Sequence, residues 1–309
     1  MALHRLSHIE IGVPASVLDA TRAFYREFGL TEIAPGRFAT SDGGEQLALV
    51  AAPRRALLAL IVGVDDADDL GRAAAAIAKL GCAAERAGET LHAREPATGI
   101  HVFLAIEPRL AQKSEAQLEA NGPGRTLRSN ARSRAAVTRA EIPRPHRLSH
   151  VVTTSTDAAA SRRFFVEGLG FCVSDEVAAI GAAFLRCSTD HHNVLVQPGP
   201  LAFLHHTAWE MEDVDAVGSA AAALVAADPK RHVWGLGRHG IGSNYFWYLR
   251  DPAGNFAEYT SDLDVIDDAE AWRVASSLPA HGLAAWGPPV PHEFLAPPDV
   301  RALATESQP

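Results

Sequence analysis

Candidate metal-binding histidines occur at four points between residues 150 and 239, and a glutamate follows them after an aromatic segment. In chain order these residues are His150, His191-His192, His205-His206, His239, Tyr248 and Glu258. Imidazole and carboxylate groups are costly to bury unless they bind an ion or pair with one another. Their setting among short apolar segments therefore predicts a divalent metal held by two histidines and Glu258, with His150 as the first of the two. A face of two histidines and one carboxylate leaves three adjacent coordination positions open, which suits non-haem iron(II) chemistry.

The composition is that of a globular protein and excludes several classes of function. Of 309 residues, 47% are hydrophobic and 21% are charged, and the formal net charge of −9 argues against a general nucleic-acid binder. No basic and apolar leader opens the chain, and no apolar run reaches the roughly 18 residues of a membrane helix. The three cysteines have no paired spacing, as in proteins of a reducing compartment. We therefore expect a cytoplasmic protein without a membrane or nucleic-acid partner.

An internal repeat predicts the architecture that positions these residues. The segment His4-Arg5-Leu6-Ser7-His8 recurs identically as residues 146–150, and residues 57–77 match residues 204–224 at an offset of 147. Each copy is typical of a strand, a helix and further strands, followed by a second such set. The sequence thus predicts an α+β fold of two tandem modules.

Local signals place the candidate residues on elements. The β-branched run 150–154 is typical of a strand, and residues 213–226 predict a helix with Asp213 at its N-cap. Residues 251–255 predict a turn and 256–260 a closing strand.

We expect four parts in the chain. These are an N-terminal module without metal (1–111), a polar linker (112–145), a C-terminal catalytic module (146–262) and a proline-rich tail (263–309). Arginines in the linker allow an anion-binding patch, but a solvated linker is the simpler interpretation. Trp286 and Phe294 predict that the tail docks on the body and covers the mouth of the second module.

With its repeat and its histidine and glutamate positions, the chain resembles the type I extradiol ring-cleavage dioxygenases. These belong to the vicinal-oxygen-chelate superfamily, together with glyoxalase I and bleomycin-resistance proteins. The resemblance covers residues 4 to about 262, and its specific motifs lie in the second repeat. It implies two modules of paired βαβββ units, one iron(II), and ring cleavage of a catechol by dioxygen. Manganese(II) is an alternative, because its ligand preferences overlap with those of iron.

The resemblance also implies roles for individual residues. The metal ligands fall on His150, His206 and Glu258, and the catalytic residues on His192, His239 and Tyr248. His192 would be the general acid and base, and the other two would bond to substrate oxygens. Neighbouring side chains on a strand point to opposite faces, so only one of His205 and His206 can enter the site; the motif selects His206. His205 is accordingly expected to be a structural residue.

The substrate pocket is less constrained by the sequence. Val152, Phe184 and Trp234 suggest apolar walls and a ring-substituted catechol. Arg186 lies two residues from Phe184 on the same strand face, so a carboxylated catechol is plausible if its side chain reaches the pocket. A homo-oligomer is also expected.

The first repeat serves as an internal control. His8 is present, but Ala59 stands where the second repeat has His206, and the strand around Phe103 has no carboxylate at the position of Glu258. We therefore expect one metal per chain. Two other classes of function remain open: a glyoxalase-like isomerase or thiol transferase, and a ligand-sequestering protein of the bleomycin-resistance type. The ligand set disfavours the binding protein, and the residues around it favour the dioxygenase over the isomerase.

Overall fold

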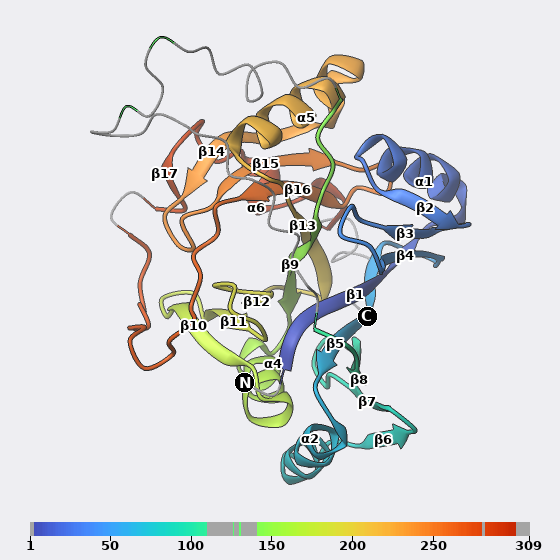
Figure 1. The fold of residues 1–309 in the computed structure, drawn as a ribbon, viewed down its shortest axis with the longest axis vertical. Helices are drawn as coiled ribbons and strands as arrows, with labels where there is room; N and C mark the ends of the chain where they lie inside the picture. Colours follow the sequence, from blue (N-terminus) through green and yellow to red (C-terminus); the bar gives the residue numbers. More distant parts are fainter. Residues whose placement is uncertain (1–2, 110–125, 127–129, 131–140, 280–281, 301–309) are drawn as a thin grey trace.

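Two mixed β-sheets, one from each half of the chain, make up the molecule (Figure 1). The computed structural model describes residues 3–109, 126, 130, 141–279 and 282–300. The linker expected at 112–145, with its arginines, lies mostly outside the described residues. No helix in the described part of the chain is long and apolar enough to cross a membrane.

The first sheet has eight strands in the order β2-β3-β4-β1-β5-β8-β7-β6. Two βαβββ units form it, and they meet where β1 and β5 pair antiparallel. Their elements are β1 (Leu3–Val13), α1 (Leu18–Glu27), β2 (Thr31–Ala34), β3 (Arg37–Ala39) and β4 (Glu45–Ala51), then β5 (Ala56–Val64), α2 (Ala67–Lys79), β6 (Ala84–Ala87), β7 (Thr90–Arg94) and β8 (His101–Ile106).

The second sheet repeats this order and adds one strand, giving β10-β11-β12-β9-β13-β16-β15-β14-β17. Its first unit is β9 (Arg147–Ser155), α4 (Ala158–Arg163), a π-helical turn η2 (Phe164–Leu169), β10 (Cys172–Val177), β11 (Ala182–Arg186) and β12 (Val194–Pro198). Its second unit is β13 (Phe203–Glu210), α5 (Val214–Ala227), a 3-10 turn η3 (Pro229–Arg231), β14 (His232–His239), β15 (Tyr245–Arg250) and β16 (Phe256–Ser261). The predicted α+β fold of two tandem modules is confirmed.

Helix α5 begins where the sequence predicts. Asp213 caps α5 by accepting a 2.7 Å hydrogen bond from the Ala216 N–H. Asp66, at the equivalent position 147 residues earlier, caps α2 in the same way. The helix α4 continues into the π turn η2, which ends at Gly170 in the left-handed region.

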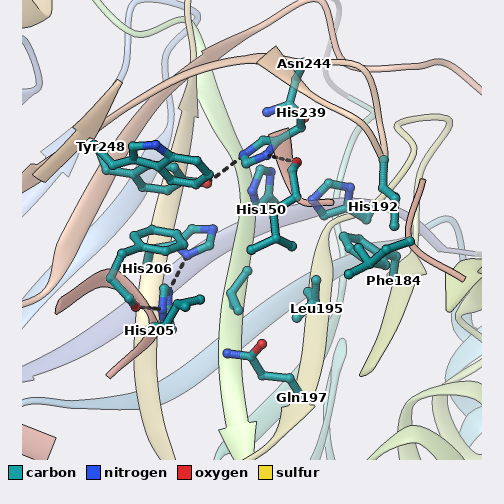
Figure 2. Close-up of a pocket in the computed structure, with 17 residues that line it drawn as sticks. His150, Phe184, His192, Leu195, Gln197, His205, His206, His239, Asn244 and Tyr248 are labelled. Carbon is teal, nitrogen blue, oxygen red and sulfur yellow. Dashed lines mark hydrogen bonds between the residues drawn. The ribbon is translucent and has the colours of Figure 1, made fainter. Parts of the chain in front are cut away.

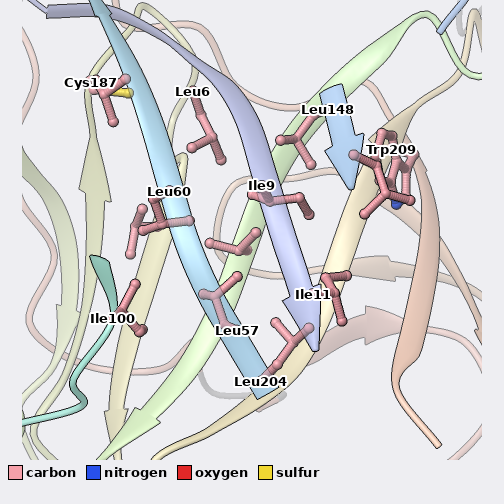
Figure 3. Packing of buried hydrophobic residues seen from close by; sticks show 14 of the residues in the cluster. Leu6, Ile9, Ile11, Leu57, Leu60, Ile100, Leu148, Cys187, Leu204 and Trp209 are labelled. Atoms are coloured by element: carbon pink, nitrogen blue, oxygen red, sulfur yellow. The ribbon is translucent and has the colours of Figure 1, made fainter. Parts of the chain in front are cut away.

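The central strands of the two sheets pack against each other through apolar side chains. Figure 3 shows Ile9 and Leu60 of the first sheet beside Leu148 and Leu204 of the second, all at most 2% exposed. At the edge of this core, the rings of Phe28 and Tyr259 stack at 4.0 Å. The first module therefore supports the back of the strands that bear the candidate site.

The tail runs along the second sheet and ends on it. After β16 it contributes β17 (Ala284–Trp286), which pairs with β14, and the short helix α6 (His292–Leu295). Phe294 of α6 is 6% exposed, whereas Trp286 is 49% exposed. Both residues lie against the second sheet: Phe294 is buried, whereas Trp286 is half exposed and its ring contacts Tyr245 edge-on at 5.9 Å.

Candidate metal centre and active site

Three adjacent strands bring the predicted ligands to one face of the second sheet. β13 carries His206 and lies between β9, with His150, and β16, with Glu258. In the registers of these pairs, Ala208 is opposite both His150 and Glu258. Residues 206 and 208 share a face because side chains alternate along a strand. A methyl group at 208 leaves room for the larger side chains around it.

The three ligand atoms converge in a fully buried position. The Nε2 atoms of His150 and His206 each lie 3.4 Å from Oε2 of Glu258, and the three atoms lie within 4.8 Å of one another. Glu258 is 0% exposed, and its Oε2 has no hydrogen-bond partner among the described residues. A buried carboxylate oxygen without a donor is costly unless a cation neutralises it. These residues therefore fit a divalent metal, and cis ligands about 2.1 Å from an ion would be about 3 Å apart.

The protonation state of His206 suits metal binding. Burial, reinforced by the neighbouring His205 and His150, holds the pKa of His206 well below its usual value. A metal binds the neutral imidazole, so this shift removes competition from protons. Glu258 is further oriented by Asn244, whose Nδ2 donates to Oε1 at 3.2 Å and to Thr260 at 2.7 Å. Sequence reasoning missed Asn244, because an asparagine at the start of a strand carries no distinctive signal.

The His205 side chain does not face away from the site, as strand alternation predicts that it would. The pairing of β13 with β9 has a register shift between Leu204 and His206, and this bulge turns His205 to the same side as His206. The Nδ1 atoms of the two rings are 2.8 Å apart, and His205 Nε2 is 2.8 Å from the carbonyl oxygen of Phe294 (Figure 2). Since that carbonyl only accepts, His205 Nε2 carries the hydrogen and its Nδ1 accepts from His206. His206 is thereby held with its Nε2 lone pair toward Glu258.

His192 lies beside the ligands on the far side of His150. The two ring centroids are 4.2 Å apart, and Phe184 packs edge-on to His192 at 5.1 Å. Burial, then the neighbouring His150, holds the pKa of His192 well below its usual value. His192 is therefore neutral in the free protein and able to accept a proton.

His239 and Tyr248 form a bonded pair opposite His192. The Tyr248 hydroxyl lies 2.9 Å from Nε2 of His239, whose Nδ1 donates to the carbonyl oxygen of Leu283 at 3.1 Å. Tyr248 is directly opposite Glu258 in the register of β15 and β16. Burial, then the charge of Glu258, keeps the pKa of the phenol well above its usual value, so the hydroxyl stays protonated and can donate.

The two metal-binding histidines, His192 and the His239–Tyr248 pair line one cavity of about 160 Å³ (Figure 2). A cavity of roughly this size with apolar walls holds a benzene-sized molecule. Val152, Phe184 and Trp234 lie on its walls, as expected from the sequence. Other lining residues were not predicted: Leu195, Gln197, Ile241, Leu278, Leu283, Phe294 and Leu295.

Arg186 does not line this cavity. A register shift between Val173 and Asp175 leaves a carbonyl and a hydroxyl of β10 facing β11. The Arg186 guanidinium donates to both, at 3.2 Å to the Val173 carbonyl and 3.0 Å to Ser174 Oγ. The idea of a carboxylated catechol, which depended on Arg186, is therefore not supported.

The tail supplies backbone partners to the site. The carbonyl of Leu283 bonds to His239, that of Phe294 to His205, and the N–H of Ala275 to Asp175. The Phe294 ring also packs on Tyr248, with centroids 4.6 Å apart. The tail is thus part of the wall and of the hydrogen-bonded surroundings of the site.

The first module lacks the equivalent ligands. Ala59 pairs with His101 in the way that His206 pairs with Phe256, which places Phe103 at the position of Glu258. His8 is bonded through Nδ1 to the carbonyl oxygen of Glu45 at 3.1 Å. In the described residues, the only cluster of three or more potential ligands is the one in the second module.

Comparisons with known proteins agree with this geometry. Residues 147–259 match the family described as the Glyoxalase/Bleomycin resistance protein/Dioxygenase superfamily. Metapyrocatechase 2 of Cupriavidus necator is 35% identical over 200 residues, which are 63% of this chain and 59% of that protein. The chain thus spans about three fifths of the length of this relative.

Solved structures are similar over nearly the whole chain. The 2,2',3-trihydroxybiphenyl 1,2-dioxygenase of Sphingomonas wittichii has a TM-score of 0.71 at 22% identity, covering 94% of this chain and 100% of its own. A Mn(II)-bound glyoxalase from Novosphingobium aromaticivorans also has a TM-score of 0.71, at 24% identity, covering 94% and 95% of the two chains. At these identities the likeness establishes the fold.

Proposed function

We propose, from the premise that the chain is a type I extradiol dioxygenase homologue within the glyoxalase, bleomycin-resistance and dioxygenase superfamily, that it cleaves the ring of a catechol with dioxygen. The observation that carries the proposal is the set of groups around the metal centre. His150, His206 and Glu258 converge from one side, while His192 and the His239–Tyr248 pair line the cavity that they face. A pure binding protein has no use for this ligand set.

The metal would be held by the two Nε2 atoms and Glu258 Oε2. When bound, it supplies adjacent coordination positions at which a catechol and dioxygen come together. Homologues use iron or manganese, and we propose iron(II) for this chain.

The side chains around the metal centre transfer protons, orient the substrate and exclude water. His192, neutral at rest, accepts the proton of a catechol hydroxyl and later returns it as an acid. Tyr248 donates its hydroxyl hydrogen to His239 Nε2, so its oxygen can accept from the other catechol hydroxyl, and His239 holds it in that orientation. The walls of Phe184, Trp234 and Phe294 hold the ring and exclude water from the reacting atoms.

The size and character of the cavity favour a catechol with an apolar substituent. Its walls are mainly aliphatic and aromatic, and its volume is that of about one ring with at most a small substituent. The Arg186 guanidinium bonds within the sheet, and among the described residues no arginine or lysine lines the cavity to pair with a carboxylate substituent.

A glyoxalase-like isomerase is the second candidate, because the fold matches that class equally well. Turnover separates the two. Protein loaded anaerobically with iron(II) is mixed with a panel of alkyl-, aryl- and carboxyl-substituted catechols, and oxygen uptake and yellow ring-opened product are followed. We expect cleavage of catechols with a small alkyl substituent and little of aryl-substituted or carboxylated ones. A Glu258→Gln variant is the matched inactive control. Oxygen-independent turnover of a hemithioacetal, without catechol cleavage, would establish the isomerase instead.

A further inference from the structure

A buried chain of hydrogen bonds leads from the tail to His192. The Ala275 N–H donates to Oδ1 of Asp175 at 2.7 Å, and Oδ2 of Asp175 lies 3.1 Å from His191 Nε2. His191 Nδ1 lies 3.0 Å from His192 Nδ1. Asp175 is 7% exposed and His191 0%. Neither Asp175 nor His191 has a role in the proposed reaction.

The donor and acceptor of each of these hydrogen bonds can be assigned by starting from the Asp175 carboxylate. An ionised carboxylate only accepts, so His191 Nε2 carries a hydrogen and donates it to Asp175. A neutral imidazole has one N–H, so His191 Nδ1 then has a lone pair and must accept from His192 Nδ1. This leaves the lone pair of His192 on Nε2, the nitrogen available to the cavity that the ring lines.

The surroundings hold this arrangement in place. The His191 N–H bonds to the carbonyl of Asp264 at 2.8 Å, and the His191 ring contacts Trp272 edge-on at 5.5 Å. Trp272 in turn donates from Nε1 to the carbonyl of Ser174, next to Asp175. The two rings and the carboxylate are therefore fixed from the side of the tail as well as from the sheet.

We propose that Asp175 and His191 are positioning residues that fix His192 with its Nδ1 protonated and its Nε2 lone pair directed at the substrate hydroxyl. The proposal rests on the function proposed above. The hydroxyl proton moves to Nε2, the catechol oxygen keeps the electron pair, and the positive charge on His192 faces the Asp175 carboxylate through the neutral His191 ring. In a serine protease a carboxylate orients the catalytic histidine directly. Here a second imidazole, that of His191, lies between the carboxylate and the catalytic ring.

Asp175→Asn is the critical variant, because it separates this role from anchoring the tail. Its Oδ1 can still accept from the Ala275 N–H, while the amide N–H donates to His191 Nε2 where the carboxylate accepted. The proton of His191 then moves to Nδ1, and that of His192 to Nε2, which can no longer accept. Glu176→Gln is the matched control, since the adjacent carboxylate bonds to Arg162 instead, at 2.8 Å.

The experiment compares the two variants in holoenzyme with and without His192. We expect Asp175→Asn to keep its iron and its KM and to lose at least about tenfold in kcat, bounded by the roughly hundredfold to ten-thousandfold cost of removing His192. In a His192→Ala background the same change should have no further effect on kcat. Glu176→Gln should match wild type in both backgrounds. An equal fold loss in both backgrounds, or a loss confined to KM, would overturn the proposal.

A second readout needs no turnover. The absorbance of 4-nitrocatechol, bound anaerobically to the iron-loaded protein, reports how far its hydroxyls are ionised. We expect a more ionised probe on wild type and Glu176→Gln than on Asp175→Asn. Equal ionisation on all three, or no binding of the probe to wild type, would refute the assignment. If wild type ionises the probe but cleaves no catechol, the proposed reaction fails and the positioning role stands.

Discussion

Replacing His205 tests whether the bulge in β13 matters to the metal. His205→Ala removes the acceptor for His206 Nδ1–H and the donor to the Phe294 carbonyl, both in bonds of 2.8 Å. A buried N–H left without a partner costs about 1–3 kcal/mol, and loss of a residue that orients a ligand typically lowers metal affinity about 10–100-fold. A tenfold change in affinity is about 1.4 kcal/mol, so a 10–100-fold loss corresponds to about 1.4–2.8 kcal/mol, within the range expected for the unpaired N–H.

The chain offers a matched replacement. The amide of His205→Gln presents one acceptor and one donor about as far apart as the two imidazole nitrogens, so it can bond to His206 and Phe294 together. We expect His205→Gln to bind iron within a few-fold of wild type and His205→Ala to bind it about 10–100-fold more weakly. His232→Ala, at an exposed site, controls for the loss of a histidine as such.

Iron affinity is measured by competition with a chelator, and thermal unfolding of the metal-free proteins is recorded beside it. Wild-type affinity in His205→Ala would refute the reasoning and return His205 to a structural role. So would equal affinity losses in the alanine and glutamine variants.

Four further results are expected. His206→Ala should lose iron and activity together, whereas His192→Ala should keep iron and turn over about 10²–10⁴-fold more slowly; the reverse pattern of iron contents would contradict the site. Metal analysis should give one tightly held ion per chain, and two would contradict the comparison of the modules. Phe294→Ala should raise the KM for catechol and the oxygen consumed per product, and unchanged coupling would count against a sealing role for the tail. Burial alone would raise the pKa of Glu32, but a backbone N–H and two guanidiniums outweigh it and lower that pKa to about 2. Its contribution, about 1 kcal/mol after solvent screening, is therefore present above pH 4.5 and lost as the pH falls toward 2, so Glu32→Gln should flatten acid unfolding curves over this range.

The ligands were predictable because the information lies in residue type and order. The repeat aligns His8 with His150 and Ala59 with His206, and the strand registers reproduce that alignment. Glu258 on a closing strand would otherwise pass for a solvent-facing residue. The helix start at Asp213 was predictable for a local reason, since its side chain bonds within the first turn.

The two side-chain placements that differ from expectation have one physical cause. Predictions for His205 and Arg186 assumed regular strands, in which side chains alternate strictly. A bulge beside each residue changes the side to which it points or the partners it finds. The contacts of the tail could not be predicted either, because they use the backbone of Ala275 and Leu283, which carries no sequence signal.

The order of these contacts along the chain divides the site into two separable parts. All three metal ligands precede residue 263, whereas the backbone groups that orient His239, His205 and Asp175 follow it. Val265, at the junction between the two parts, is exposed. A protein that lost its tail to proteolysis at this junction would therefore keep its three metal ligands and lose the groups that align the residues around them.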